Sequence, residues 1–117
     1  MRYALLIYSD IDVRDATPEE DRRRVNARVA EVLERPEVTG WVRLQAVESA
    51  TTVRHGGGRT LLTDGPFVES KDFLGGLIIV EAENLDGALA VAGELQEIRD
   101  AGAIEVRPLR DEAPSGA

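Results

Sequence analysis

Segment 63–72 concentrates the side chains of this chain that could carry chemistry. It places three carboxylates, of Asp64, Glu69 and Asp72, and the only lysine, Lys71, around a Gly-Pro bend. A lysine beside carboxylates can anchor an anionic substrate, or it can transfer a proton where burial lowers its pKa. We therefore expect Asp64 to act as a general base or orienting carboxylate and Lys71 as an anion anchor or acid. A structured loop with a solvated ion pair is the alternative interpretation, and composition alone favours it.

The Gly65-Pro66 bend is expected to contact the substrate. Asp64 can fix the bend by accepting backbone N–H bonds, and Pro66 pushes Gly65 toward extended geometry. Because glycine permits close approach, we expect the substrate-contacting residues of this segment to be Gly65, Pro66, Phe67 and Glu69. As a third interpretation, Asp64, Glu69 and Asp72 could bind a divalent cation through their oxygens.

An apolar segment near the C-terminus carries charged residues at alternate positions. Ile104 and Val106 share one face of the predicted strand and should meet the helices, so Glu105 and Arg107 point to the other face. Charged side chains there should be paired or line a wet cleft. They form either the polar wall of a substrate cleft, to which Tyr8 could add a hydroxyl, or a salt bridge at an interface.

Composition and charge narrow the class of protein. The chain has 117 residues, and its 14 basic and 22 acidic residues give a formal net charge of −8, which argues against nucleic acid as a partner. The absence of cysteine excludes disulfides and thiolate chemistry, and a single histidine, His55, nearly excludes a zinc site. Without a long apolar run or a signal sequence, we expect a cytoplasmic protein with no membrane contact, no metal and no cofactor.

Apolar periodicity predicts the elements that position these residues. Principal strands are expected at 2–9, 41–47, 74–81 and 103–109, and short strands at 51–54 and 60–63 predict a hairpin with a glycine tip. Thr17, followed by Pro18 and Glu20, predicts a capping box that starts the first helix, and Pro36 ends that helix. Asn84 is expected to cap the second helix.

The order of these elements predicts the fold and the assembly. Without the hairpin it is βαββαβ, which indicates an α+β, ferredoxin-like domain over 1–110, followed by a disordered tail at 111–117. Right-handed crossovers place both helices on one face of the sheet. Strands 2–9 and 74–81 are apolar on both faces, so the opposite face also needs a cover. We therefore expect a homodimer in which two copies pair sheet to sheet.

Residues 63–71, Thr-Asp-Gly-Pro-Phe-Val-Glu-Ser-Lys, resemble a signature of the YCII-related family in its DGPF-domain branch. Similar blocks at 3–8, 50–54, 74–76, 85–88 and 104–108 extend the resemblance along nearly the whole chain. Ser70 and Asp72 depart from the usual threonine and glutamate. The resemblance implies a dimeric α+β barrel with a cleft between sheet and loops near the dimer interface. Some relatives carry a His–Asp pair suggested as catalytic, but His55 lies in the hairpin, so that pair does not transfer.

Two classes of function stay open at this point. The carboxylates and lysine favour a protein that binds or transforms a small molecule by acid/base chemistry. The alternative is a non-catalytic regulator that acts through protein–protein contact. The acidic surface and the DGPF branch, whose genes often lie beside sigma factors of the extracytoplasmic type, point to a sigma factor as its partner. The sequence leaves open whether the chain is an enzyme.

Overall fold

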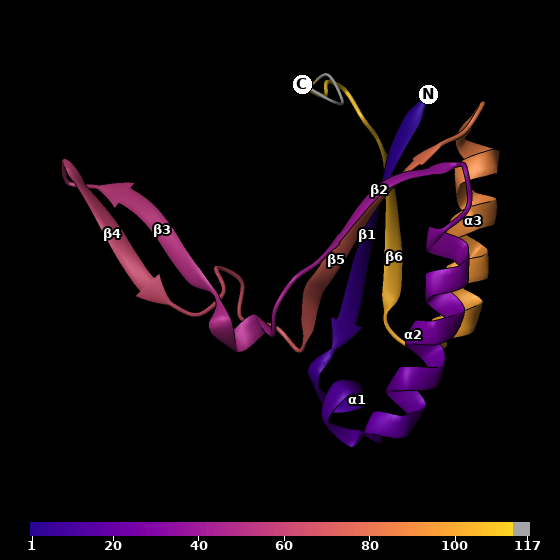
Figure 1. Cartoon of the computed structure of the whole chain (residues 1–117). Helices are drawn as coiled ribbons and strands as arrows, with labels where there is room; N and C mark the ends of the chain where they lie inside the picture. The colour runs from indigo at the N-terminus through magenta and orange to yellow at the C-terminus, as the bar shows by residue number, and fades with distance from the viewer. Residues whose placement is uncertain (114–117) are drawn as a thin grey trace.

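The computed structural model describes residues 1–113 and builds them around one antiparallel sheet (Figure 1). Its four strands lie in the order β2-β5-β1-β6, and β3 and β4 form a separate hairpin that projects away from this sheet. The strands are β1 (Arg2–Asp10), β2 (Val38–Arg43), β3 (Thr51–Gly56), β4 (Arg59–Asp64), β5 (Asp72–Glu81) and β6 (Ala103–Pro108). The helices are α1 (Ile11–Ala16), α2 (Glu19–Leu33) and α3 (Leu85–Arg99), with a short 3-10 turn η1 (Val47–Ser49).

This topology confirms the predicted α+β, ferredoxin-like fold with an inserted hairpin. β1 and β5 occupy the centre of the sheet, and α2 and α3 pack side by side on one of its faces (Figure 1). The sheet of one chain stays open and does not close into a barrel. Residues 114–117 of the predicted tail lie outside the described residues, whereas Glu112 pairs with Arg2 at 2.8 Å.

The core lies between the sheet and the two long helices. Tyr3 and Leu5 of β1 and Val80 of β5 are at most 2% exposed, and Leu95 of α3 is 1% exposed. The buried cluster is completed by Val29, Val32, Ile78, Ala88, Val91 and Ala92. Burying an aliphatic side chain of this size contributes about 1.5–3 kcal/mol to folding. This one face of the sheet therefore supplies most of the driving force.

The opposite face of the sheet, named here the open face, has no layer over it within residues 1–113 (Figure 1). Leu6 of β1 and its neighbours Leu77 and Ile79 of β5 alternate with core residues and are only half-buried. The predicted two-faced apolar character of the central strands is thus present, with one face covered by helices and the other uncovered in the single chain.

The segment between β1 and α2, which precedes the predicted start of the first helix at Thr17, contains a further short helix. Residues 11–16 form α1, because the Asp10 carboxylate accepts a hydrogen bond from the Val13 N–H at 3.1 Å and caps the helix. The predicted capping box is wrong. Thr17 ends α1, and its hydroxyl donates to the Val13 carbonyl, while Pro18 is the N-cap of α2 and supplies no side-chain bond.

Strand β2 begins and ends earlier than predicted, at Val38 and Arg43. The prediction places Gly40 before the strand, but Gly40 lies inside it, at a shift in the pairing with β5. The predicted hairpin is confirmed, and its turn uses Gly57 and Gly58 at φ of 56° and 74°, where glycine is favoured. Residues 44–50 become the connection that contains η1.

Candidate functional site

The Gly65-Pro66 bend is held by Ala50 and Thr52 in place of the predicted Asp64 carboxylate. The Gly65 N–H donates to the Ala50 carbonyl at 2.7 Å, and the Thr52 hydroxyl donates to the Gly65 carbonyl at 2.7 Å. Gly65 has a φ of 102°, a left-handed conformation that favours glycine, in place of the predicted extended one. Asp64 is the exposed last residue of β4, so its carboxylate is accessible from solvent.

Lys71 contacts α1. Its ammonium group lies 2.9 Å from the Asp12 carboxylate, its side chain is 76% exposed, and its carbonyl accepts from the Ile11 N–H at 2.8 Å. The hydrogen bond to Asp12 raises the pKa of Lys71. This is the opposite of the shift that proton transfer near neutral pH requires. Among residues 1–113, Lys71 therefore forms its ion pair with Asp12 of α1 and not with a carboxylate of segment 63–72.

Two adjoining hollows, together named the open-face hollow, lie where β1 and β5 meet the connecting loops. One, of about 760 Å³, is lined by Pro66 and Phe67, the other, of about 850 Å³, by Glu105, and both by Tyr8 and Asp72. The structure thus brings together four predicted site residues, Tyr8, Pro66, Phe67 and Glu105. The remaining predicted site residues lie outside this lining: Asp64, Gly65, Glu69, Lys71 and Arg107.

A β-bulge shapes this end of the sheet. The pairing of β1 with β5 shifts so that Ile7 lies opposite Gly76 while Tyr8 lies opposite Leu74. Bulges re-aim side chains, and here Tyr8 and Leu74 both line the open-face hollow. A Cβ at Gly76 would stand 2.7 Å from the carbonyl oxygen of Val42 in β2. The close approach of β2 and β5 therefore requires glycine at this position.

Strand β6 presents its charged residues as predicted. Ile104 and Val106 pack against the core, which turns Glu105 and Arg107 toward the open face, and both charged residues are exposed. Glu105 borders the open-face hollow, whereas Arg107 lies further along the strand, opposite Ala4. Their predicted pairing across an interface involves a partner chain and stays a prediction.

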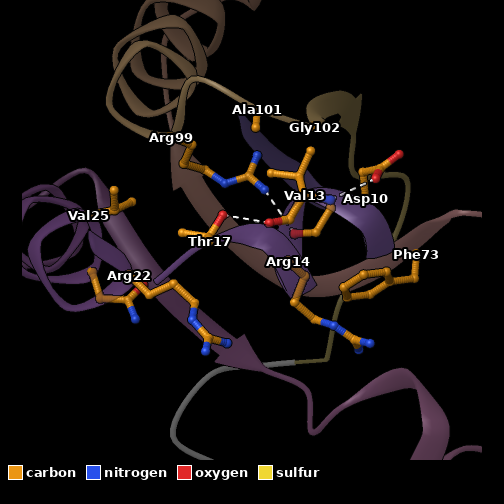
Figure 2. A pocket seen from close by; sticks show the side chains of 12 residues that line it. Asp10, Val13, Arg14, Thr17, Arg22, Val25, Phe73, Arg99, Ala101 and Gly102 are labelled. Atoms are coloured by element: carbon orange, nitrogen blue, oxygen red, sulfur yellow. Dashed lines mark hydrogen bonds between the residues drawn. The ribbon is translucent and has the colours of Figure 1, made fainter. Parts of the chain in front are cut away.

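A pocket on the helix side of the sheet was not predicted from the sequence (Figure 2). It contains Arg99, whose guanidinium donates to the Tyr8 carbonyl at 2.9 Å, the Ser9 hydroxyl at 3.1 Å and the Gln96 side-chain oxygen at 2.9 Å. Burial lowers the pKa of Arg99. An arginine in the last turn of a helix is ordinarily explained by the helix dipole. The sequence carries no signal that pairs it with Ser9, 90 positions away.

Arg14 lines the same pocket, but its charge is already compensated. It donates to Glu48 at 2.7 and 3.0 Å and to Asp15 at 3.0 Å, and its guanidinium lies 5.4 Å from the centre of the Phe73 ring. The hydrogen bonds to Glu48 and Asp15 raise the pKa of Arg14. Figure 2 shows Arg14 beside Phe73 and Arg99 near the loop at 101–102.

The structure does not bring the acidic residues of segment 63–72 together as a cation site. Among residues 1–113, no group of three or more His, Cys, Asp or Glu side chains is arranged to hold a metal ion. The third interpretation of Asp64, Glu69 and Asp72 is therefore not supported. Across the same residues, every helix is too short or too polar to cross a membrane.

The fold and its hollows define a class: a small α+β domain of ferredoxin-like topology, with an open sheet and pockets at one end of the central strands. The chain belongs to the YCII-related domain family, whose model matches residues 1–113. A relative from Rhizobium meliloti (strain 1021), an uncharacterised protein, is 36% identical over 114 residues, which cover 93% of this chain and 92% of the relative. Neither match names a ligand or a reaction, so function has to be argued from the site.

Proposed function

We propose that this protein is a homodimer that binds or transforms a small molecule in the open-face hollow by acid/base chemistry. The observation that carries the proposal is the position of Tyr8 and Asp72, which line both halves of the hollow beside an apolar face that the chain itself leaves uncovered. A hydroxyl and a carboxylate at that junction can orient a ligand and exchange a proton with it.

Fewer residues of segment 63–72 support this proposal than the sequence predicted. Phe67 is 72% exposed and lines the hollow, and the Arg54 guanidinium lies 5.9 Å from its ring centre. The raised pKa of Lys71 argues against the role of acid, and the role of anion anchor requires Lys71 to leave Asp12, with which it is paired outside the lining of the hollow. Asp64 is retained as an orienting carboxylate, because it ends β4 next to the bend.

A second copy of the chain is the proposed cover of the open face. The half-buried side chains of Leu6, Leu77 and Ile79 form an apolar surface that favours burial. Interfaces around a two-fold axis are self-complementary. Glu105 and Arg107, which have opposite charges and lie two residues apart on the same face, allow reciprocal pairing of each with the other in the second copy.

The β3–β4 hairpin also favours a second copy of the chain as the partner. Val53 and Leu62 lie opposite each other in the β3–β4 pairing and are 65% and 69% exposed. A two-stranded hairpin is marginally stable in water without further packing. A hairpin that projects from its own sheet (Figure 1) and carries apolar side chains on its surface is suited to pack on the second copy.

The dimer is tested by changing one leucine on each face. Leu77→Asp should convert the dimer to a monomer in sedimentation equilibrium at micromolar concentration, because a charge would be buried between the sheets. Leu89→Asp is the matched control, since Leu89 lies on α3 and is 45% exposed. It should leave the dimer intact. A wild-type protein that sediments as a monomer would contradict the proposed assembly.

Ligand binding is tested by native mass spectrometry of protein purified from cell extract. Wild-type protein should retain a small molecule, and both Tyr8→Phe and Asp72→Asn should lose it. Asp86→Asn, at an exposed position in the first turn of α3, is the control that should retain it. The regulatory alternative predicts instead that a sigma factor co-purifies, that no small molecule is bound, and that the Tyr8 and Asp72 variants behave as wild type.

A further inference from the structure

We propose that the cleft between α2 and the sheet is a second binding site, which takes a small organic carboxylate with an apolar body. The Arg99 guanidinium would bind the carboxylate, and the apolar part of the cleft would hold the hydrocarbon. This site lies on the helix side of the sheet. It adjoins the Glu105 half of the open-face hollow, with which it shares Asp10, Val13, Ala101 and Gly102, but Arg99 lines only the cleft.

The cleft consists of two adjoining cavities with one shared boundary. Their volumes are about 200 and 220 Å³, and Ser9, Val25, Asn26 and Arg99 line both. Each cavity alone lies below the range of about 300–1,000 Å³ typical of drug-sized ligands, and the two together lie near its lower end. The occupant is therefore a compact molecule whose polar group sits at the shared boundary.

Arg99 is the cation at that boundary, and its own contacts leave it able to bind an anion. Its three hydrogen bonds go to a carbonyl, a hydroxyl and an amide oxygen, all of them uncharged acceptors. A guanidinium has five N–H groups, so two remain for a ligand. Within residues 1–113, no carboxylate is recorded within 4.0 Å of Arg99, although its side chain is half-buried.

The guanidinium is also fixed in place before any ligand arrives. Its acceptors include the backbone of β1, and Gln96 is held in turn because its amide donates to the Ala101 and Gly102 carbonyls at 3.1 and 3.0 Å. Gly102 has a φ of 70°, and a Cβ there would stand 2.1 Å from the Tyr8 carbonyl oxygen. The glycine therefore allows the turn to close on Arg99. A side chain held in its binding geometry loses little entropy on binding.

The surroundings of Arg99 favour a monoanion with a hydrocarbon body. Arg14 is already paired with Glu48 and Asp15, so Arg99 is the uncompensated cation nearest the shared boundary, while Arg22 is exposed at the rim. The second cavity continues from Arg99 between mostly apolar side chains, among them Val29, Leu33, Trp41, Ile78 and Leu95. Arg43 also lines it, but this residue is exposed and its guanidinium lies 5.4 Å from the centre of the Trp41 ring. A carboxylate matches the charge of Arg99, and an alkyl or aryl group matches the apolar wall.

Trp41 provides a direct readout of the test, because it is the only tryptophan of the chain and lines the apolar cavity. Titration of the full chain with hexanoate should change the Trp41 fluorescence to a saturating value. 1-Hexanol, which has the same hydrocarbon without the charge, should bind at least about tenfold more weakly, as expected for loss of a charge-assisted hydrogen bond. Inorganic phosphate should not compete. The absence of a saturable signal, or equal binding of 1-hexanol or phosphate, would overturn the proposal.

Substitutions assign the site to Arg99. Arg99→Gln should weaken hexanoate binding at least about tenfold, whereas Arg28→Gln, which removes the same charge from an exposed position on α2, should leave it unchanged. If Arg99→Gln fails to fold, Asn26→Asp tests the same point, because it places a carboxylate at the shared boundary from an exposed helix position. Unchanged affinity in a folded variant would refute the assignment. Tyr8→Phe should not alter hexanoate binding, which separates this site from the open-face hollow.

Discussion

The two faces of the sheet are built from the same strands but have different environments. Along β1, Leu5 is 0% exposed beneath the helices, while the next residue, Leu6, points to the open face and is half-buried. Composition does not distinguish these neighbours, since both are leucine. The difference is that α2 and α3 cover one face and the chain supplies no cover for the other within residues 1–113. Strand β1 therefore has two apolar faces, and other parts of the chain cover only one of them within these residues.

The two pockets follow the same division, although they adjoin at Asp10, Val13, Ala101 and Gly102. Tyr8 lines the wide open-face hollow, and its neighbour Ser9 lines the narrow cleft on the helix side. The hollow is bordered by loops and exposed side chains, so its final shape depends on the proposed partner. The cleft is bordered by α2, α3 and the sheet, and its polar group, Arg99, is fixed by three hydrogen bonds. The binding site proposed on the covered face is therefore complete in one chain, whereas the one proposed on the open face is not.

Substitution of the two adjacent leucines is the strongest test of this difference. Leu5→Ala should lower the free energy of unfolding by about 2–5 kcal/mol at every protein concentration, because it leaves a cavity in a closed core. Leu6→Ala should cost less than Leu5→Ala in the monomer, where Leu6 is half-buried, and its cost should grow at concentrations at which the dimer forms. Urea unfolding followed by circular dichroism over a range of protein concentrations measures both. Equal, concentration-independent losses would show that the open face is no interface.

A second test concerns the packing of β2 against β5. Gly76→Ala should lower the free energy of unfolding by about 1–3 kcal/mol, because the added methyl group would meet the Val42 carbonyl at 2.7 Å and force the strands apart. Gly75→Ala is the control, since its Cβ would meet atoms at ordinary contact distances of 3.7 Å and more. Similar losses for both variants in urea unfolding would contradict the role given to Gly76.

The sequence predicted those features that depend on local periodicity. The two-faced strands, the hairpin and the placement of Glu105 and Arg107 follow from the period of two along a strand, and the structure confirms them. The starts of the helices were harder to predict, because more than one residue in the segment before α2 can cap a helix. Thr17 is a good capping residue, but Asp10 caps α1 first, and the hydroxyl of Thr17 then bonds back to Val13.

The candidate site was less predictable, because it depends on contacts between distant residues. Of the predicted site residues, Tyr8, Pro66, Phe67 and Glu105 line the open-face hollow and the other five do not. Lys71 binds Asp12 across a separation that local spacing does not reveal. The Arg99 pocket joins the end of α3 to β1 through the ferredoxin-like crossover, so only the tertiary fold shows it. A basic residue at a helix end carries no such signal.

The two charged residues of β6, Glu105 and Arg107, provide a further test of the open face as an interface. Glu105→Arg should weaken the dimer about tenfold, because like charges would face each other across the proposed two-fold interface. The double variant Glu105→Arg with Arg107→Glu should recover most of the affinity, since the reciprocal pairs are restored with their signs exchanged. Sedimentation equilibrium measures both. If the double variant is as weak as the single one, the two residues do not pair across the interface.

The smallest expected effect is a pH-dependent change in folding stability that comes from an ion pair on the helix-covered side. The Arg35 guanidinium donates to both oxygens of Glu94, one of them at 2.7 Å, and so joins α3 to the loop after α2. These hydrogen bonds lower the pKa of Glu94 from its usual 4.5. A lowered pKa in the folded state means that the pair stabilises the fold above pH 4.5 and that this contribution is lost as the pH falls through the lowered value.

Glu94→Gln should therefore lower the Tm by no more than a few degrees at pH 7, since the pair is exposed to solvent and screened by salt. The difference from wild type should shrink as the pH falls below 4.5. Glu97→Gln, at an exposed position on the same helix, is the control for loss of a negative charge alone. A Glu94 effect as large as that of Leu5→Ala would mean that surface charge pairs hold the two long helices together. The small effect expected assigns that role to the apolar core beneath them.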